Sequence, residues 1–128
     1  MTAGSGARAT LRYGNVALRA LMELGIVGGF GSWGFHVGRT AATKVALGIG
    51  APLAGFGVWA LVDFRSAGAA AEWLRMAEEL VISGLAAGAW CAAGQRPLGV
   101  ALALVSVVHH ALVYLLGDTL LHRPRPAR

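Results

Sequence analysis

The fold is decided by residues 98–117, which read LGVALALVSVVHHALVYLLG. This run contains no Asp, Glu, Lys or Arg. At about 1.5 Å per residue, a helix of about 20 residues spans the hydrocarbon core of a bilayer, which is about 30 Å thick. Three more apolar runs, at residues 14–37, 41–62 and 73–93, are separated by short polar or glycine-containing breaks. The sequence therefore predicts an all-α membrane protein, a bundle of four transmembrane helices.

The overall composition agrees with a lipid environment. Of the 128 residues, 56% are hydrophobic and 13% are charged, whereas soluble domains carry about 25% charged residues. A domain this small has too high a surface-to-volume ratio to bury so much apolar surface in water. The net charge of +5 comes largely from Arg residues near the ends of the apolar runs. The positive-inside rule explains them with the lipid bilayer as partner, so we expect no nucleic acid.

Cysteine and histidine usage bears on cofactors. Cys91 is a lone cysteine, so the sequence holds no disulfide framework and no paired-cysteine metal or redox motif. The His residues show no metal-ligand spacing that we recognise. We therefore expect neither a metal nor a cofactor.

The charges also predict a topology. We expect a basic tail at residues 1–13, a transmembrane domain at residues 14–117 and a second basic tail at residues 118–128. Four crossings place both tails on one side of the membrane, and the Arg excess on that side predicts that both termini are cytoplasmic. Arg19 and Glu23 interrupt the first apolar run, so we interpret this run as a retained helix rather than a cleaved signal peptide.

A short motif occurs twice. Residues 18–24 read LRALMEL in the first apolar run, and residues 74–80 read LRMAEEL in the third. The copies are two helices apart, so both have the same orientation in the membrane. This repeat predicts two tandem helical hairpins related by an axis along the membrane normal.

Polar residues inside the apolar runs are the candidate site residues, because charge in the bilayer centre is costly. Arg19 and Glu23 share a helix face, as do Arg75 and Glu79, and His110 lies on a third polar stripe. We expect the three stripes to meet in a polar pocket on the cytoplasmic side. Its predicted catalytic acid–base groups are Glu23, Glu79 and His110. Its predicted ligand-binding residues are Asn15, Arg19, Arg75, Glu78, Ser106 and Tyr114.

Some of these residues also have a purely structural interpretation. Arg–Glu pairs near the ends of membrane helices extend toward the interface and hold a bundle together, and this role stays open for both pairs. His109 falls among Val and Leu positions, so we expect it to pack against apolar neighbours.

Glycine pairs spaced four apart let membrane helices approach closely. Three such pairs occur, and they predict close helix packing within the chain or a homo-oligomer formed through the glycine-rich faces. The pairs are Gly25 and Gly29, Gly34 and Gly38, and Gly84 and Gly88.

The stripe of Asn15, Arg19 and Glu23, with the glycine-rich stretch and Trp33-Gly34 after it, resembles the YrdB-like family of small bacterial membrane proteins. Residues 51–53 with Trp59, and residues 74–80, extend the resemblance, which covers roughly residues 14–115. It implies a four-helix protein of the bacterial cell (inner) membrane. It implies no particular chemistry.

Three functions remain open from the sequence. The first is binding of a polar or amphipathic small molecule, or of protons, in the Arg/Glu/His pocket, with proton-coupled transport as one form. The second is a membrane-embedded acid–base enzyme, an isomerase or cyclase, acting on a lipid-soluble or terpenoid substrate. The third is an accessory subunit of a larger membrane complex.

Overall fold

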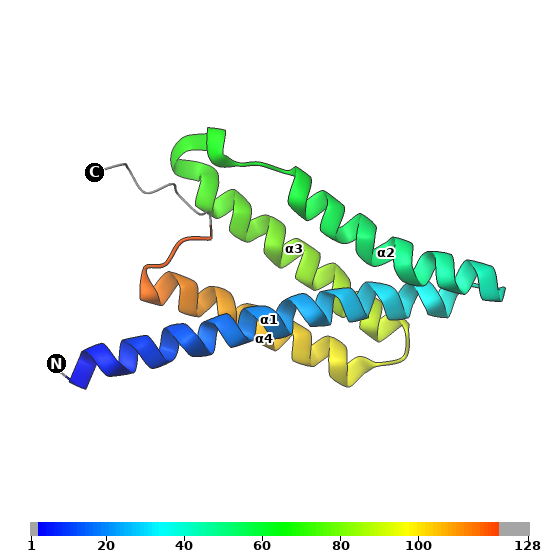
Figure 1. Cartoon of the computed structure of the whole chain (residues 1–128), viewed down its shortest axis with the longest axis horizontal. Helices are drawn as coiled ribbons and strands as arrows, with labels where there is room; N and C mark the ends of the chain where they lie inside the picture. The colour runs from blue at the N-terminus through cyan, green and yellow to red at the C-terminus, as the bar shows by residue number, and fades with distance from the viewer. Residues whose placement is uncertain (1–2, 121–128) are drawn as a thin grey trace.

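The computed structural model describes residues 3–120 as four α-helices and a short 3₁₀ segment (Figure 1). The helices are α1 (Ala3–Val37), α2 (Ala41–Leu61), α3 (Ala71–Ala92) and α4 (Arg96–Leu116), and the 3₁₀ segment η1 (Arg65–Ala70) lies between α2 and α3. All four predicted runs are therefore helical. The basic tail expected at residues 118–128 lies outside the described residues from position 121 onward.

The first helix begins earlier than the sequence predicted. The described part of the expected basic tail, from Ala3 onward, is helical and continuous with α1. Its residues are exposed from Gly4 to Gly14, so they bury no apolar face that the hydropathy pattern could reveal. Ala, Arg and Leu are good helix formers, and their propensity favours extension of a helix that packing already holds further along.

Caps and glycines set the breaks between helices. Thr40 and Thr43 form a reciprocal capping box at the start of α2, which satisfies backbone N–H groups that the first turn leaves free. Gly94 has a φ of 83° in the turn before α4, and Gly117 has a φ of 66° directly after α4. Both values lie in the left-handed region, which only glycine adopts at little cost.

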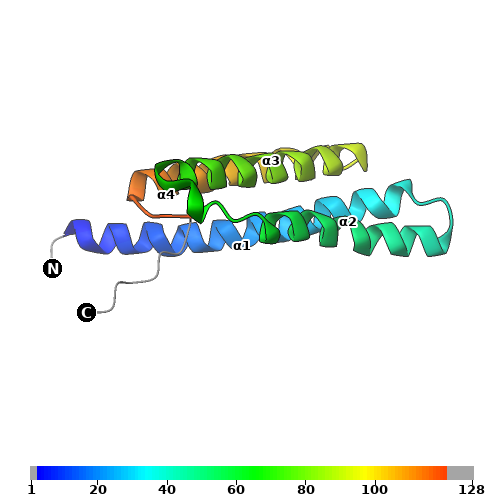
Figure 2. The same cartoon turned by 90° about the horizontal axis from the view of Figure 1, so that it is seen from above.

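The helices form two stacked hairpins. Seen from above, α1 and α2 make one layer and α3 and α4 make the other (Figure 2). α1 contacts all three other helices, whereas α2 packs mainly on α1 and touches α3 over a short stretch. Arg12 pairs with Asp118 at 3.1 Å, so the N-terminal part of α1 and the end of α4 lie at the same end of the bundle.

The apolar core lies between α1, α3 and α4. Its buried members are Met22, Ile26, Ile82, Ala86, Ala87 and Leu102. The Trp90 ring lies against Gly28 and Gly29 of α1, and its Nε1 donates a hydrogen bond to the Gly25 carbonyl at 2.8 Å. A Cβ at Gly29 would lie 2.6 Å from the Ala86 carbonyl oxygen, so this helix crossing requires glycine.

The three predicted glycine pairs differ in what they contact. Gly34 and Gly38 lie against the start of α2, and Gly25 and Gly29 lie against α4 and α3, as expected for close packing. Gly84 and Gly88 differ, because a Cβ at either position would meet no atom within 4 Å. The prediction of close packing within the chain is therefore wrong for this third pair, since it lies on the outer face of α3.

Two of the described helices, α2 and α4, are long and apolar enough to cross a membrane. None of the residues of α2 is fully buried in the protein, although Phe56 and Trp59 pack against the core. In α1 and α3, charged side chains lower the mean hydropathy of helices that are otherwise long enough to span.

Candidate functional site

A group of charged and polar side chains lies between α1, α3 and α4, under the end of α2. We call it the polar cluster. Its members are Asn15, Arg19, Glu23, Arg75, Glu78, Glu79, His109 and His110. The structure thus brings together residues from all three predicted stripes.

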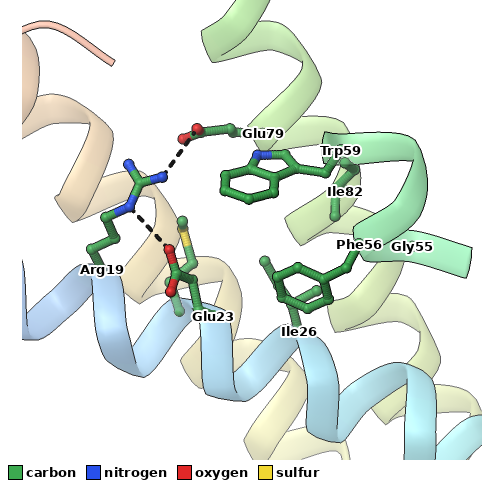
Figure 3. A pocket seen from close by; sticks show the side chains of 9 residues that line it. Arg19, Glu23, Ile26, Gly55, Phe56, Trp59, Glu79 and Ile82 are labelled. Atoms are coloured by element: carbon green, nitrogen blue, oxygen red, sulfur yellow. Dashed lines mark hydrogen bonds and ion pairs between the residues drawn. The ribbon is translucent and has the colours of Figure 1, made fainter. Parts of the chain in front are cut away.

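Glu79 is the centre of the polar cluster, with a side chain that is 2% exposed. Its Oε1 accepts a hydrogen bond from Arg75 Nε at 3.2 Å and lies 3.5 Å from Arg19 Nη2. Its Oε2 lies 3.1 Å from His110 Nε2. Arg19 also donates to Glu23 at 3.0 Å, so it bridges two carboxylates (Figure 3). One buried carboxylate therefore connects three helices.

Arg75 connects the polar cluster to α2. Its Nη1 donates to Glu78 Oε2 at 2.8 Å and to the Trp59 carbonyl oxygen at 3.0 Å. Its Cζ lies 4.4 Å from the centroid of the Trp59 ring, a distance typical of a cation–π contact. The carbonyl is near the C-terminal end of α2, where backbone acceptors lack intrahelical partners and a cation is favoured.

The two copies of the Arg–Glu repeat lie in different environments. The side chains of Arg19 and Glu23 are 31% and 42% exposed, whereas those of Arg75 and Glu79 are 12% and 2% exposed. The Trp59 ring lies closer to the second copy, at 4.4 Å from Arg75 Cζ against 5.9 Å from Arg19 Cζ, and the second copy is the more buried of the two.

His109 belongs to the polar cluster, contrary to the prediction that it packs among apolar residues. Its Nδ1 lies 2.7 Å from Asn15 Oδ1, and its side chain is buried. Successive residues on a helix point about 100° apart, and α4 lies against both α1 and α3. Consequently His109 faces Asn15 on α1, while His110 faces Glu79 on α3.

Ser106 and Tyr114 do not join the ionic contacts. The Ser106 hydroxyl is buried without a hydrogen-bond partner, while its backbone carbonyl lies 2.7 Å from His110 Nδ1. Tyr114 is 71% exposed, and its ring lies against Trp73. A spacing of four residues overshoots a full turn by about 40°, so the predicted stripe leaves the cluster by Tyr114. A ligand-binding role for either residue stays a prediction.

Three hollows border the polar cluster. The α1/α2/α3 pocket lies between Trp59, Phe56 and Glu79 (Figure 3) and contains a free volume of about 20 Å³, enough for a single water molecule. The α1/α4 hollow, of about 540 Å³, is lined by Asn15, Arg19, His109 and Asp118 among others. The α3/α4 hollow, of about 180 Å³, reaches His110. The two histidines therefore border different openings.

Several polar atoms of the site have no hydrogen-bond partner. They are Glu78 Oε1, Ser83 Oγ, Ser106 Oγ and His109 Nε2. Buried polar atoms are usually paired, so each of these atoms has room in its hydrogen bonding for a water molecule or a ligand. Glu79, His109 and His110 each offer one metal-ligating atom, and these atoms lie within 4.8 Å of one another.

These features define an all-helical protein with an ionised cluster buried between its helices. The chain belongs to a family of proteins of unknown function, DUF2568, whose family model matches residues 17–107. Comparisons with curated proteins and with solved structures gave no match. The matched range includes five of the eight members of the polar cluster, whereas Asn15, His109 and His110 lie just outside it.

Proposed function

We propose that this protein is a four-pass membrane protein that binds a small positively charged species, a cationic small molecule or a proton, in the polar cluster. Both termini are cytoplasmic in this proposal, and proton-coupled transport is the activity it serves. The closer assignment to the YrdB-like group, with a place in the bacterial cell membrane, is part of the same proposal and rests on the Asn15–Arg19–Glu23 stripe.

The distribution of apolar surface supports four crossings. Large hydrophobic side chains are exposed on all four helices, for example Leu24 at 69%, Val58 at 58%, Val81 at 61% and Leu104 at 61%. The charged residues in the middle of α1 and α3 turn toward the polar cluster instead. Apolar residues outward and ionised residues inward is the arrangement that a lipid solvent favours.

The charge balance of the polar cluster is the observation that carries the binding proposal. Three carboxylates, Glu23, Glu78 and Glu79, face two guanidinium groups, Arg19 and Arg75. With neutral imidazoles the cluster is one positive charge short. Glu23 is 42% exposed, so water solvates part of this excess negative charge, and a small cation that enters the cluster would neutralise it.

Access from one end of the bundle supports uptake of a solute. The α1/α4 hollow opens beside Asp118 and reaches Arg19 and His109. Arg12 pairs with Asp118 at the same end, which is the end that the Arg excess predicts to be cytoplasmic. The cluster is therefore in contact with that solvent rather than sealed by the bundle.

An acid–base enzyme is the second candidate, favoured by the close carboxylate–imidazole contact of Glu79 and His110. The α1/α2/α3 pocket beside Glu79 has a free volume of about 20 Å³, whereas sites for drug-sized ligands measure about 300–1,000 Å³. A terpenoid substrate would require α2 to move away. The space in this pocket therefore suits a small cation, whereas the larger α1/α4 hollow borders Arg19 and His109 rather than Glu79.

Reporter fusions test the topology. Fusions after Gln95 and after Arg128 should report opposite compartments, with the C-terminal fusion cytoplasmic. A pair of fusions that report the same compartment would refute the four-pass arrangement, whatever the site binds.

Flux through proteoliposomes tests the binding proposal. Vesicles containing a trapped pH indicator are given an inward gradient of methylammonium or of protons, and the rate is compared with that of protein-free vesicles. We expect Glu79→Gln to abolish the protein-dependent rate for at least one of the two cations. The matched control is Asp63→Asn, which removes a carboxylate that is 63% exposed in the loop after α2. Equal rates for wild type and Glu79→Gln with both cations would contradict the proposal.

A further inference from the structure

The two adjacent histidines of α4 are held in one tautomer by their surroundings. His110 Nδ1 lies 2.7 Å from the Ser106 carbonyl oxygen, and His109 Nδ1 lies 2.7 Å from the side-chain oxygen of Asn15. A carbonyl oxygen only accepts hydrogen bonds, so both Nδ1 atoms must donate. In each neutral ring, Nε2 therefore carries a lone pair and no proton.

The lone pair of His110 faces an acceptor. His110 Nε2 lies 3.1 Å from Glu79 Oε2, and a carboxylate oxygen cannot donate. Two acceptors at this distance repel each other unless a positive species lies between them. Either a proton or a metal ion satisfies this pair.

The state of His109 distinguishes the two. Its Nε2 is buried and has no hydrogen-bond partner. A proton shared by His110 and Glu79 leaves this nitrogen without a protein partner, so that only water could donate a hydrogen bond to it. A metal ion takes lone pairs from both histidines and from Glu79 together.

We propose that Glu79, His109 and His110 form a binding site for one first-row transition-metal dication. The proposal rests on the cation-binding function above and names the class of cation. Two imidazoles and one carboxylate suit Zn²⁺ and its neighbours in the series, whereas Mg²⁺ and Ca²⁺ prefer all-oxygen sites.

The surroundings provide the second shell that such sites need. The Ser106 carbonyl and the Asn15 side chain orient the two rings, and Arg75 binds Glu79 Oε1, which leaves Oε2 for the metal. Second-shell partners of this kind fix ligand orientation and raise affinity. The neighbouring guanidinium charges are balanced by Glu23 and Glu78, at 3.0 Å and 2.8 Å.

The required movement is small. Each of the three residues has one potential ligand atom within 4.8 Å of those of the other two. Bonds of about 2.0–2.1 Å in a tetrahedral site put ligand atoms roughly 3.3 Å apart. Side-chain rotations that move each ligand atom by about an ångström would bring the three atoms to this separation. The hollows beside His109 and His110 give the side chains space to rotate.

Metal titration tests the proposal directly. The full chain is purified in detergent without a polyhistidine tag, stripped with a chelator, and titrated with Zn²⁺ against a chromophoric competitor. We expect one ion per chain. Co²⁺ at the same site should give the visible absorption of a low-symmetry site with mixed nitrogen and oxygen ligands, and Zn²⁺ should displace it.

Variants identify the ligands. His109→Gln, His110→Gln and Glu79→Gln should each weaken Zn²⁺ binding at least about 100-fold, and the second-shell variant Asn15→Ala should weaken it about 10–100-fold. His36→Gln is the matched control, because His36 is exposed at the far end of α1, and it should bind as wild type does. Circular dichroism checks that each variant remains helical, and Asn15→Ala still tests the site where a ligand variant does not fold.

Two results would overturn the proposal. The first is that wild-type protein binds no more Zn²⁺ than the double variant that carries both His36→Gln and His109→Gln. The other is unchanged affinity and Co²⁺ absorption in His109→Gln, which would leave a proton as the species between His110 and Glu79. Neither result affects the topology or the loss of methylammonium or proton flux in Glu79→Gln, so the failure of this inference and that of the proposed function are distinguishable.

Discussion

Replacement of Arg75 and of Arg19 by methionine, one at a time, should lower the free energy of unfolding by different amounts, with the larger loss at Arg75. Arg75→Met removes the cation that neutralises Glu78 and Glu79, whose side chains are 10% and 2% exposed. Arg19→Met removes the partner of Glu23, which is 42% exposed. Methionine keeps most of the aliphatic length in both variants, so the comparison isolates the guanidinium group.

The magnitudes differ because water reaches only one of the stranded carboxylates. Breaking a buried ion pair by removal of one partner costs about 3–5 kcal/mol, and Arg75 also loses its hydrogen bond to the Trp59 carbonyl. An exposed pair contributes about 0.2–1 kcal/mol, and Glu79 retains Arg75 and His110 when Arg19 is absent. The expected difference of about 3 kcal/mol corresponds to roughly a hundredfold in the folding equilibrium.

Equilibrium unfolding in mixed detergent micelles, followed by far-ultraviolet circular dichroism, measures both losses. Dichroism is preferred to tryptophan fluorescence, because Trp59 contacts Arg75 and its emission will change without unfolding. Equal destabilisation by the two substitutions would refute the asymmetry that burial assigns to the repeat. A loss below about 1 kcal/mol for Arg75→Met would mean that water solvates Glu79.

Four further substitutions test the helix packing and the Arg12–Asp118 ion pair. Gly29→Leu should lower the free energy of unfolding by at least about 1–3 kcal/mol, because its Cβ would lie 2.6 Å from the Ala86 carbonyl oxygen. Gly84→Leu should instead stabilise the protein slightly through helix propensity. Thermal unfolding in detergent measures both changes. Trp90→Phe should cost about 1 kcal/mol in the same assay, since it removes the 2.8 Å hydrogen bond from α3 to α1. Arg12→Gln should cost less than about 1 kcal/mol, because its ion pair is exposed, and added salt should reduce even that difference.

The helices could be predicted because each contains a largely apolar run of about 20 residues. The ends of α3 and α4 could also be predicted, since Gly94 and Gly117 adopt the positive φ values that are common directly after a helix. The N-terminal extension of α1 was missed because its exposed residues carry no apolar periodicity, and hydropathy detects burial rather than helix. The outward direction of Gly84 and Gly88 was missed because a glycine pair indicates a helix face without side chains but does not indicate whether another helix packs on it.

The candidate site was predictable in its ionic part. The four-residue spacing of Arg75 and Glu79 fixes a shared face, and the structure pairs them at 3.2 Å. The role of His109 was missed because the sequence analysis assumed a single buried polar face on this helix. In the structure α4 contacts both α1 and α3, so two neighbouring faces of α4 are buried. The unequal burial of the two repeats could not be predicted from their similar sequences. It depends on where the end of α2 lies and on the Trp59 ring, which lies over Arg75.

The position of α2 has a mechanical consequence. At one end, α2 is held to α1 by the close approach of Gly34 and Gly38 to Leu47 and Lys44, and among the described helices it makes no contact with α4. At the other end, Trp59 reaches α3 mainly through Arg75. A swing of α2 about its glycine end would break the Arg75–Trp59 contacts, the approach of Arg19 to the Trp59 ring at 5.9 Å, and the packing of Phe56 and Trp59 on the core. Because Gly55, Phe56 and Trp59 of α2 line the same pocket as Glu79, such a displacement would widen the space beside this carboxylate.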